Sequence, residues 1–90
     1  MLSIRYSGRF KRDVRRLENR GKVVEKLKAA MRLLAQQESL PAAYGDHPLK
    51  GEWKGYRDIH IEPDWILIYR IAGTELLLVA SGTHADIFEI

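Results

Sequence analysis

The order of hydrophobic patterns along the chain predicts a single α+β domain, in which an antiparallel sheet carries two helices on one face. Three observations support this fold class. The 90 residues are enough for one modest hydrophobic core. Helical periodicity is confined to the first half of the chain, and short apolar runs bounded by turn residues occupy the second half. We find no repeat, low-complexity segment or linker, so residues 1–90 are expected to form one domain.

The first half is expected to contain a strand and an αα-hairpin. Residues 2–6 alternate apolar and polar side chains, as a short strand does. Ser7 is a suitable N-cap for a helix over residues 8–20, and Gly21 is a natural turn after it. A second helix should cover about residues 22–37. The buried faces of these helices are predicted to consist of Phe10, Val14, Leu17, Val23 or Val24, Leu27, Met31 and Leu34.

The second half is expected to form most of the sheet. A loop over residues 38–48 should come first, because Pro41, Gly45 and Pro48 interrupt any regular pattern. Pro63 then suits a tight turn between two strands. The predicted strands form a four-stranded antiparallel meander near residues 49–54, 57–62, 65–71 and 75–81.

Strand periodicity decides which polar side chains can act together in the strand at 57–62. Asp58, His60 and Glu62 share one face, and the isoleucines between them share the other. The isoleucines belong in the core against the helices. Burying the polar row without partners would cost several kcal/mol per charge, so we expect this row to face outward or to line a groove.

Composition and charge limit the classes of function. The absence of cysteine excludes a disulfide, a thiolate nucleophile and a cysteine–zinc site. The apolar runs are too short to span a bilayer, and the N-terminus lacks an apolar stretch typical of a signal peptide, so we expect a cytoplasmic protein without a membrane partner. Residues 1–32 contain eleven Lys or Arg and three Asp or Glu, a net charge of +8. This basic half suits an anionic partner such as RNA or an acidic protein, and the alternative is a solvated helix surface.

All three histidines lie in the second half, and each is within two residues of an aspartate. Histidine can both accept and donate a proton near neutral pH, so this pattern in a basic protein suggests acid–base chemistry on a polyanion. The alternative for each histidine is a structural or merely exposed side chain. Histidines and acids also bind zinc, but no pair here has the close helical spacing of a zinc motif, and we expect no metal or cofactor.

Four segments of the second half resemble the RelE/ParE superfamily of type II toxins, and most closely its YafQ-like branch of ribosome-dependent mRNA endonucleases. The block His-x-Glu-Pro-Asp-Trp-Ile-Leu-x-Tyr is the longest and most specific of these segments. The order of the N-terminal strand and the helical hairpin also agrees. The segments that carry the resemblance are Tyr44 to Leu49, Trp53 to Asp58, His60 to Tyr69, and Gly82 to His84 together with Phe88.

The resemblance implies a small toxin of RelE-like fold that cleaves mRNA in the ribosomal A site, near rRNA. It also implies a RelB/DinJ-like antitoxin that holds the toxin inactive, with operator DNA contacted only through that antitoxin. The residues that match those implicated in cleavage are His47, Asp58, His60, Asp64, His84 and Phe88. Some relatives carry an arginine four residues before the last histidine, where this chain has Ala80. The candidates for substrate binding are therefore Lys54, Arg57 and Arg70, with Trp65, for which core packing is the alternative.

The expected reaction is attack of the RNA 2′-hydroxyl on the neighbouring phosphate, which needs a base, an acid and a cation, but no metal. We expect His84 to act as the general acid and Asp64 or His60 as the base. Asp58 would orient a histidine, and His47 would assist proton transfer or phosphate binding. Phe88 would stack on a base. Two rival functions remain, a ParE-like toxin that inhibits gyrase without cleaving RNA and an inactive toxin-fold binding module.

Overall fold

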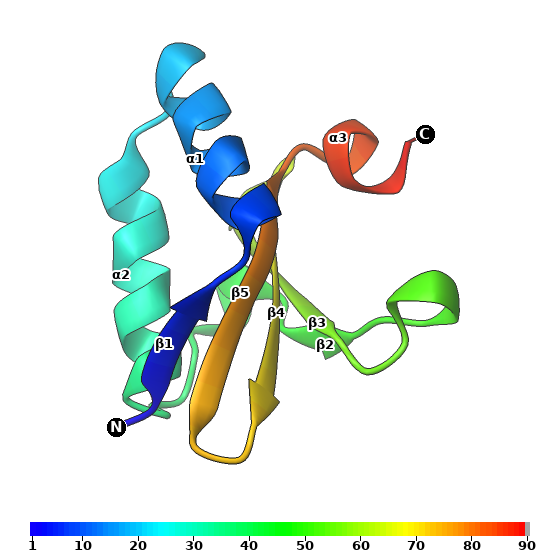
Figure 1. Cartoon of the computed structure of the whole chain (residues 1–90). Helices are drawn as coiled ribbons and strands as arrows, with labels where there is room; N and C mark the ends of the chain where they lie inside the picture. Colours follow the sequence, from blue (N-terminus) through cyan, green and yellow to red (C-terminus); the bar gives the residue numbers. More distant parts are fainter. Residues whose placement is uncertain (90) are drawn as a thin grey trace.

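The computed structural model describes residues 1–89, which form a mixed five-stranded sheet and three α-helices (Figure 1). The strands lie in the order β1-β5-β4-β3-β2. Two single-turn 3₁₀ helices, η1 (Ala42–Tyr44) and η2 (Gly51–Trp53), flank β2. The other elements are β1 (Ser3–Tyr6), α1 (Gly8–Asn19), α2 (Val24–Ala35), β2 (His47–Pro48), β3 (Arg57–Glu62), β4 (Trp65–Ala72), β5 (Glu75–Gly82) and α3 (His84–Phe88). The predicted α+β class and the helical hairpin on one face of the sheet are confirmed.

The prediction of a wholly antiparallel sheet is wrong at one edge, where β1 runs parallel to β5. The pairing begins with Ser3 opposite Glu75 and ends with Tyr6 opposite Leu78. Hairpin turns in the sequence indicate which consecutive strands pair. Nothing local indicates that a strand at the N-terminus will join the last strand of the sheet, about 70 residues later, because that contact depends on how the helical hairpin returns the chain across the sheet.

The strand predicted near residues 49–54 is also wrong. Strand β2 contains only His47 and Pro48, and η2 follows it. Gly51 has a φ of +67°, a left-handed conformation that ends an extended run. The ring of Trp53 then packs edge-on against that of Tyr56, with centroids 5.7 Å apart. The apolar residues that suggested a strand therefore cover the sheet instead of extending it.

The sheet is buried on both faces, and a different set of elements covers each face. On the first face, α1 and α2 pack against β3, β4 and β5 around Ile59, Leu67 and Leu78. On the second face, Ile66 and Ile68 of β4 are covered by α3 and by the segment around η2. Because β4 has a covered side chain on either face, every residue from 65 to 69 is buried. Within residues 1–89, no helix is long and apolar enough to cross a membrane.

Polar side chains of α1 and of its N-cap form hydrogen bonds to a bulge in β5. The register of β5 against β4 shifts between Leu78 and Ala80, which leaves an extra residue at Val79. The hydroxyl of Ser7 caps α1 and also donates to the carbonyl of Val79 at 2.6 Å. The buried carboxylate of Asp13 accepts the backbone N–H of Ser81 at 3.0 Å. These bonds fix the path of β5 immediately before it reaches the residues that lead into α3.

Candidate active site

The rings of three histidines and one phenylalanine form a row on the second face of the sheet. Ring centroids are 6.4 Å apart for His47 and His60, 5.4 Å for His60 and His84, and 6.3 Å for His84 and Phe88. The rings come from β2, β3 and α3, so three segments that are distant in the sequence build one site. The structure therefore brings together the four predicted catalytic rings.

Strand register explains this convergence. His47 pairs with Asp58 across β2 and β3. His60 pairs with Ile66 across β3 and β4, and Ile66 pairs with Gly82 across β4 and β5. The chain then turns from Gly82 into α3, whose first residue carries the third histidine. Neighbouring strands lie about 4.8 Å apart, so this alignment places the rings within contact distance.

His84 forms the best-defined polar pair of the site with Asp64, which lies in the turn between β3 and β4. The Asp64 Oδ1 atom accepts the backbone N–H of His84 at 3.0 Å and lies 2.6 Å from the ring Nδ1. The backbone hydrogen bond from His84, followed by the ring hydrogen bond, lowers the pKa of the Asp64 carboxyl below its ordinary value. The pair holds the imidazole in one orientation and leaves Nε2 available to a substrate.

His47 has a different aspartate beside it. Its Nδ1 atom lies 2.8 Å from the carbonyl oxygen of Gly45 and 2.9 Å from Asp58 Oδ1. Asp58 Oδ1 has no partner with hydrogen-bonding geometry among the described residues. The expectation that the polar row of β3 faces outward or lines a groove is wrong for Asp58, which is only 3% exposed where β3 pairs with β2. Burial raises the pKa of the Asp58 carboxyl, and the nearby histidines oppose this shift.

Gly45 forms a close support for the ring of His60. A Cβ atom at position 45 would stand 3.3 Å from His60 Nδ1, and the backbone there has a φ of +59°. Both the space and the left-handed conformation favour glycine. A side chain at this position would crowd the ring of His60, so Gly45 contributes to the site without carrying a reactive group.

Helix α3 is an element that the sequence analysis missed. Thr83 accepts the backbone N–H of Asp86, and the Asp86 carboxylate accepts the backbone N–H of Thr83, which together form a capping box. The Thr-x-x-Asp pattern is a known signature of this cap, so the helix could have been predicted from the sequence. Arg20, the C-cap residue of α1, donates to Asp86 at 2.7 Å, which strongly lowers the pKa of that carboxyl. Helix α1 thereby holds the element that carries His84 and Phe88.

The predicted substrate-binding residues do not all lie at the row of rings. Trp65 is fully buried on the helix face, where its Nε1–H donates to the hydroxyl of Ser81 at 3.0 Å, so its prediction as a substrate contact is wrong. Arg57 forms an ion pair with Asp46 at 3.1 Å. The guanidinium of Arg70 lies 6.0 Å from the centroid of the Tyr56 ring. Lys54 is exposed directly after η2.

Asp46 is a second structural residue that sequence reasoning did not select. Its Oδ1 atom accepts the hydroxyl of Tyr69 at 2.6 Å and Nε of Arg57 at 3.1 Å. This shared hydrogen bond raises the pKa of the Arg57 guanidinium, and burial, followed by the contact with Asp46, raises the pKa of the Tyr69 hydroxyl. Asp46 directly precedes His47, so the contacts anchor the loop that carries this histidine.

Two further observations concern where a phosphate-binding cation or a metal ion could lie. Ala80 is fully buried against Ile66 and Ile68, so in this chain the position adds to the apolar cluster and supplies no cation. Among residues 1–89, no group of three or more His, Cys, Asp or Glu side chains is arranged to hold a metal ion. The carboxylates of Asp58 and Asp64 are each paired with a different histidine instead.

Comparisons with known proteins identify relatives along nearly the whole chain. A family model described as the bacterial toxin of a type II toxin–antitoxin system, YafQ, matches residues 2–89. The curated mRNA interferase toxin YafQ of Escherichia coli strain K12 is 51% identical over 86 residues, which are 94% of each chain. The crystal structure of YafQ from E. coli BL21(DE3) aligns with a TM-score of 0.93 at 48% identity, covering 98% of this chain and 99% of that one. The E. coli DinJ–YafQ complex aligns with a TM-score of 0.89 at 50% identity, covering 97% of both chains.

Proposed function

The chain belongs to the YafQ family of bacterial type II toxins, and we propose that it is an endoribonuclease that cleaves mRNA on the ribosome by histidine acid–base catalysis. The observation that carries this proposal is the continuous row of His47, His60, His84 and Phe88, with an aspartate beside each end histidine. A toxin that only bound its target would have no need for these paired histidines, which disfavours a gyrase inhibitor or an inactive binding module.

The reaction needs little from the protein beyond proton transfer and charge stabilisation. RNA supplies its own nucleophile, the 2′-hydroxyl next to the scissile phosphate. A base removes the proton of this hydroxyl while the O2′–P bond forms, and an acid protonates the 5′-oxygen as the P–O5′ bond breaks. An internal nucleophile in the correct position lowers the barrier by roughly 7–11 kcal/mol.

His84 is the proposed general acid. When both of its ring nitrogens carry protons, Nδ1–H donates to Asp64, and Nε2–H is left to donate to the leaving 5′-oxygen. The lowered pKa of Asp64 keeps this residue negatively charged, so it stabilises the protonated form of the ring. The same contact makes Asp64 a poor base, and we therefore assign it the role of orienting His84.

His60 is the proposed general base. It stands between the two histidines that have aspartate partners, and within residues 1–89 its ring makes no hydrogen bond of its own. An unengaged imidazole nitrogen can accept the proton of the 2′-hydroxyl. Asp58 orients His47, which is close enough to His60 to share in proton transfer or to contact the phosphate.

Substrate binding in this proposal uses cationic side chains and stacking on the phenylalanine at the end of the row. Arg57 is neutralised by Asp46, whereas Lys54 and Arg70 have no acidic partner in the described part of the chain. Lys54 and Arg70 are thus better suited to contact RNA phosphates. Phe88 is half-buried next to His84 and offers a ring on which a base can stack, an interaction worth about 1–3 kcal/mol.

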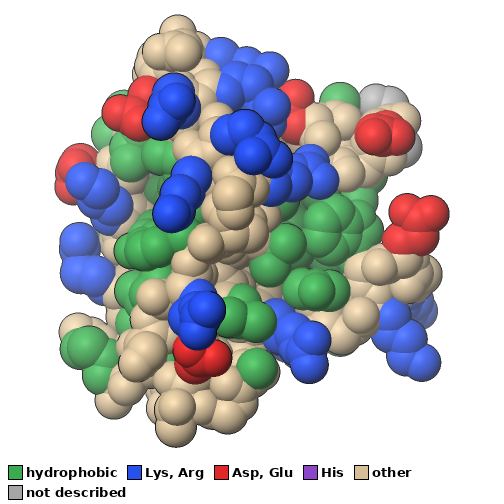
Figure 2. All heavy atoms as spheres, in the orientation of Figure 1, with side chains coloured by type: hydrophobic (Ala, Val, Ile, Leu, Met, Phe, Trp, Pro, Cys, Tyr) green, Lys and Arg blue, Asp and Glu red, His purple; other side chains and the backbone are tan. Residues whose placement is uncertain are grey.

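The proposed partners are mRNA in the ribosomal A site and a DinJ-like antitoxin, as the E. coli DinJ–YafQ complex suggests. Lysine and arginine side chains gather over α1 on the face shown in Figure 2, where no histidine is visible. Within α1, Arg12 and Arg15 are exposed, and Arg16 is bound to Asp13. Such a face fits an acidic antitoxin segment or rRNA, and the proposed action on ribosomes implies a cytoplasmic protein.

The experiment that tests this function compares the wild-type protein with His84→Ala on ribosomes programmed with a defined mRNA. Loss of the general acid should reduce the single-turnover cleavage rate by about 10²-fold or more. The ring is half-exposed, so the melting temperature should change little. A folded His84→Ala protein that cleaves at the wild-type rate would remove the proposed mechanism.

A further inference from the structure

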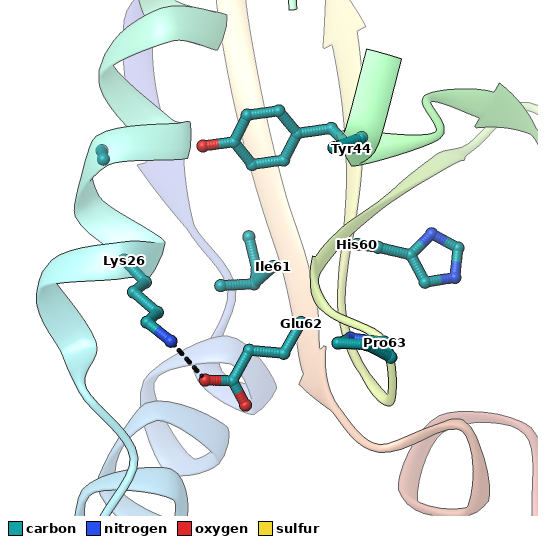
Figure 3. A pocket seen from close by; sticks show the side chains of 8 residues that line it. Lys26, Tyr44, His60, Ile61, Glu62 and Pro63 are labelled. Carbon is teal, nitrogen blue, oxygen red and sulfur yellow. Dashed lines mark hydrogen bonds and ion pairs between the residues drawn. The ribbon is translucent and has the colours of Figure 1, made fainter. Parts of the chain in front are cut away.

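A cavity of about 620 Å³ lies beside the row of rings, between α2, η1 and the end of β3 (Figure 3). His60 stands at its rim with its ring directed away from Lys26 and Glu62, so β3 separates the cavity from the other rings. The remaining side chains of the cavity have not entered the proposed mechanism. The cavity lies next to His60, the proposed general base, so we expect it to receive a part of the RNA substrate.

The cavity combines apolar walls with a fixed pair of opposite charges. Tyr44 extends its ring from η1 toward α2, and Ile61 and Pro63 add apolar surface (Figure 3). The carboxylate of Glu62 accepts Lys26 Nζ at 2.8 Å and Lys22 Nζ at 2.9 Å. Two lysines against one carboxylate give this corner a net positive charge. Each lysine still has N–H donors, and the carboxylate still has lone pairs, to offer a ligand.

Within residues 1–89, one edge of strand β3 has no neighbouring strand where it borders the cavity. Strand β2 pairs only with Arg57 and Asp58, so the edge of β3 from residue 59 onward has no strand beside it. Helix η1 lies near this edge, and Gly45 at its end supports the ring of His60. A chain that crosses the edge of β3 beside Gly45 can therefore reach both the row of rings and the cavity.

We propose that this cavity binds the nucleobase that flanks the scissile phosphate, with Tyr44 as the stacking surface and the Lys26–Glu62 pair as the reader of the base edge. This inference rests on the proposed function. Proteins that read single-stranded RNA stack unpaired bases on aromatic rings and bond the base edge through side chains. Every base edge presents at least one donor and one acceptor, which match a carboxylate and an ammonium group. The net positive corner also tolerates the adjacent phosphate.

The test measures cleavage rates on purified ribosomes for a set of mRNAs that differ only at nucleotides around the cleavage site. Tyr44→Leu removes the stacking ring, and kcat/KM should fall by about tenfold for the preferred nucleotide. The dependence of rate on the identity of that one nucleotide should also flatten. Tyr44→Phe keeps the ring and should keep the preference. Tyr6→Leu is the matched control, because Tyr6 is an exposed tyrosine on β1, away from the cavity.

A second variant separates base reading from folding. Glu62→Gln replaces an acceptor-only group by one that also donates, so it should change which nucleotide is preferred at the same position. Thermal melts establish whether each variant is folded. If Tyr44→Leu does not fold, Glu62→Gln alone provides the test. A wild-type preference that persists unchanged in the folded variants would overturn the assignment of the cavity. Absence of cleavage by the wild-type protein itself would instead overturn the proposed function.

Discussion

The two histidine–aspartate pairs at opposite ends of the ring row have the same composition and opposite surroundings. Asp64 lies in a turn with its side chain 68% exposed, and His84 contacts it through both backbone and ring. Asp58 lies in β3 with its side chain 4% exposed, and its contact with His47 lacks hydrogen-bonding geometry. The pKa of the Asp64 carboxyl is lowered by the hydrogen bonds from His84, whereas burial raises that of Asp58.

This difference teaches that environment, more than residue type, assigns the roles. A carboxylate that is exposed and hydrogen-bonded keeps its charge and stabilises a protonated histidine beside it. Burial destabilises the charged form of a carboxyl, so a buried aspartate supports its histidine mainly by holding it in position. We therefore propose that the pair His84–Asp64 serves proton donation and that the pair His47–Asp58 serves orientation.

The pH dependence of cleavage should separate the two histidines. A general acid must be protonated, so its removal abolishes the fall in rate at alkaline pH. We expect His84→Gln to lower kcat by about 10²–10⁴-fold and to remove this alkaline limb. His47→Gln should cost less and keep the limb. Single-turnover rates across pH provide the measurement, and equal losses with identical profiles would contradict the distinction between the pairs.

Neutralising each aspartate should have unequal effects on the rate. We expect Asp64→Asn to lower the cleavage rate by the larger amount, because the protonated His84 loses its counter-charge. Asp58→Asn keeps the shape of the support under His47 and should lose less. Cleavage rates of the two variants at one pH decide the order, and a greater loss in Asp58→Asn would reverse our assignment.

The same two variants should change stability in opposite directions. The pKa of Asp58 is higher in the folded state, so that state binds more protons between the ordinary carboxyl pKa and the raised value, and stability falls as pH rises through this window. Asp58→Asn should therefore stabilise the protein at neutral pH, by on the order of 1 kcal/mol. This gain should disappear below the ordinary carboxyl pKa.

Asp64 has a lowered pKa in the folded state, so its contribution is present above the ordinary carboxyl pKa and is lost as pH falls through the folded value. Asp64→Asn should consequently melt at or below the wild-type temperature at neutral pH. Thermal melts at pH 3.5 and at pH 7.5 measure both effects. A rise in melting temperature for Asp64→Asn, with a fall for Asp58→Asn, would show that the two environments have been interpreted the wrong way round.

The smallest expected effect is that of metal removal. Each aspartate of the site is paired with a histidine of its own, and proton transfer between histidines and RNA requires no ion bound to the toxin. Toxin treated with chelator and then desalted should cleave mRNA at the untreated rate, on ribosomes that keep their own magnesium. Activity that returned only with added zinc or manganese would require a different mechanism.

The fold class and the helical hairpin follow from the sequence, and the sequence also supplied most of the candidate site residues. Ser7 as a cap, the apolar stripes of both helices and the apolar runs of β4 and β5 are local features, and local patterns predict them well. The histidines were selected by their chemistry and by a resemblance in short blocks. The capping box at Thr83 was equally visible, although the sequence analysis did not use it.

Only the tertiary structure decided where those residues lie relative to one another. The parallel pairing of β1 with β5, the burial of Trp65 and the burial of Asp58 all depend on contacts between distant segments. An alternating strand pattern gives two faces without stating what covers each, and here the η2 segment and α3 cover the second face. The predicted row of Asp58, His60 and Glu62 is also broken, because the register of β3 shifts between His60 and Glu62, and Glu62 bonds to Lys22 and Lys26 instead. The unequal surroundings of Asp58 and Asp64 follow from that packing, because the pKa of a carboxyl depends on its solvation and on the partners that the fold brings to it.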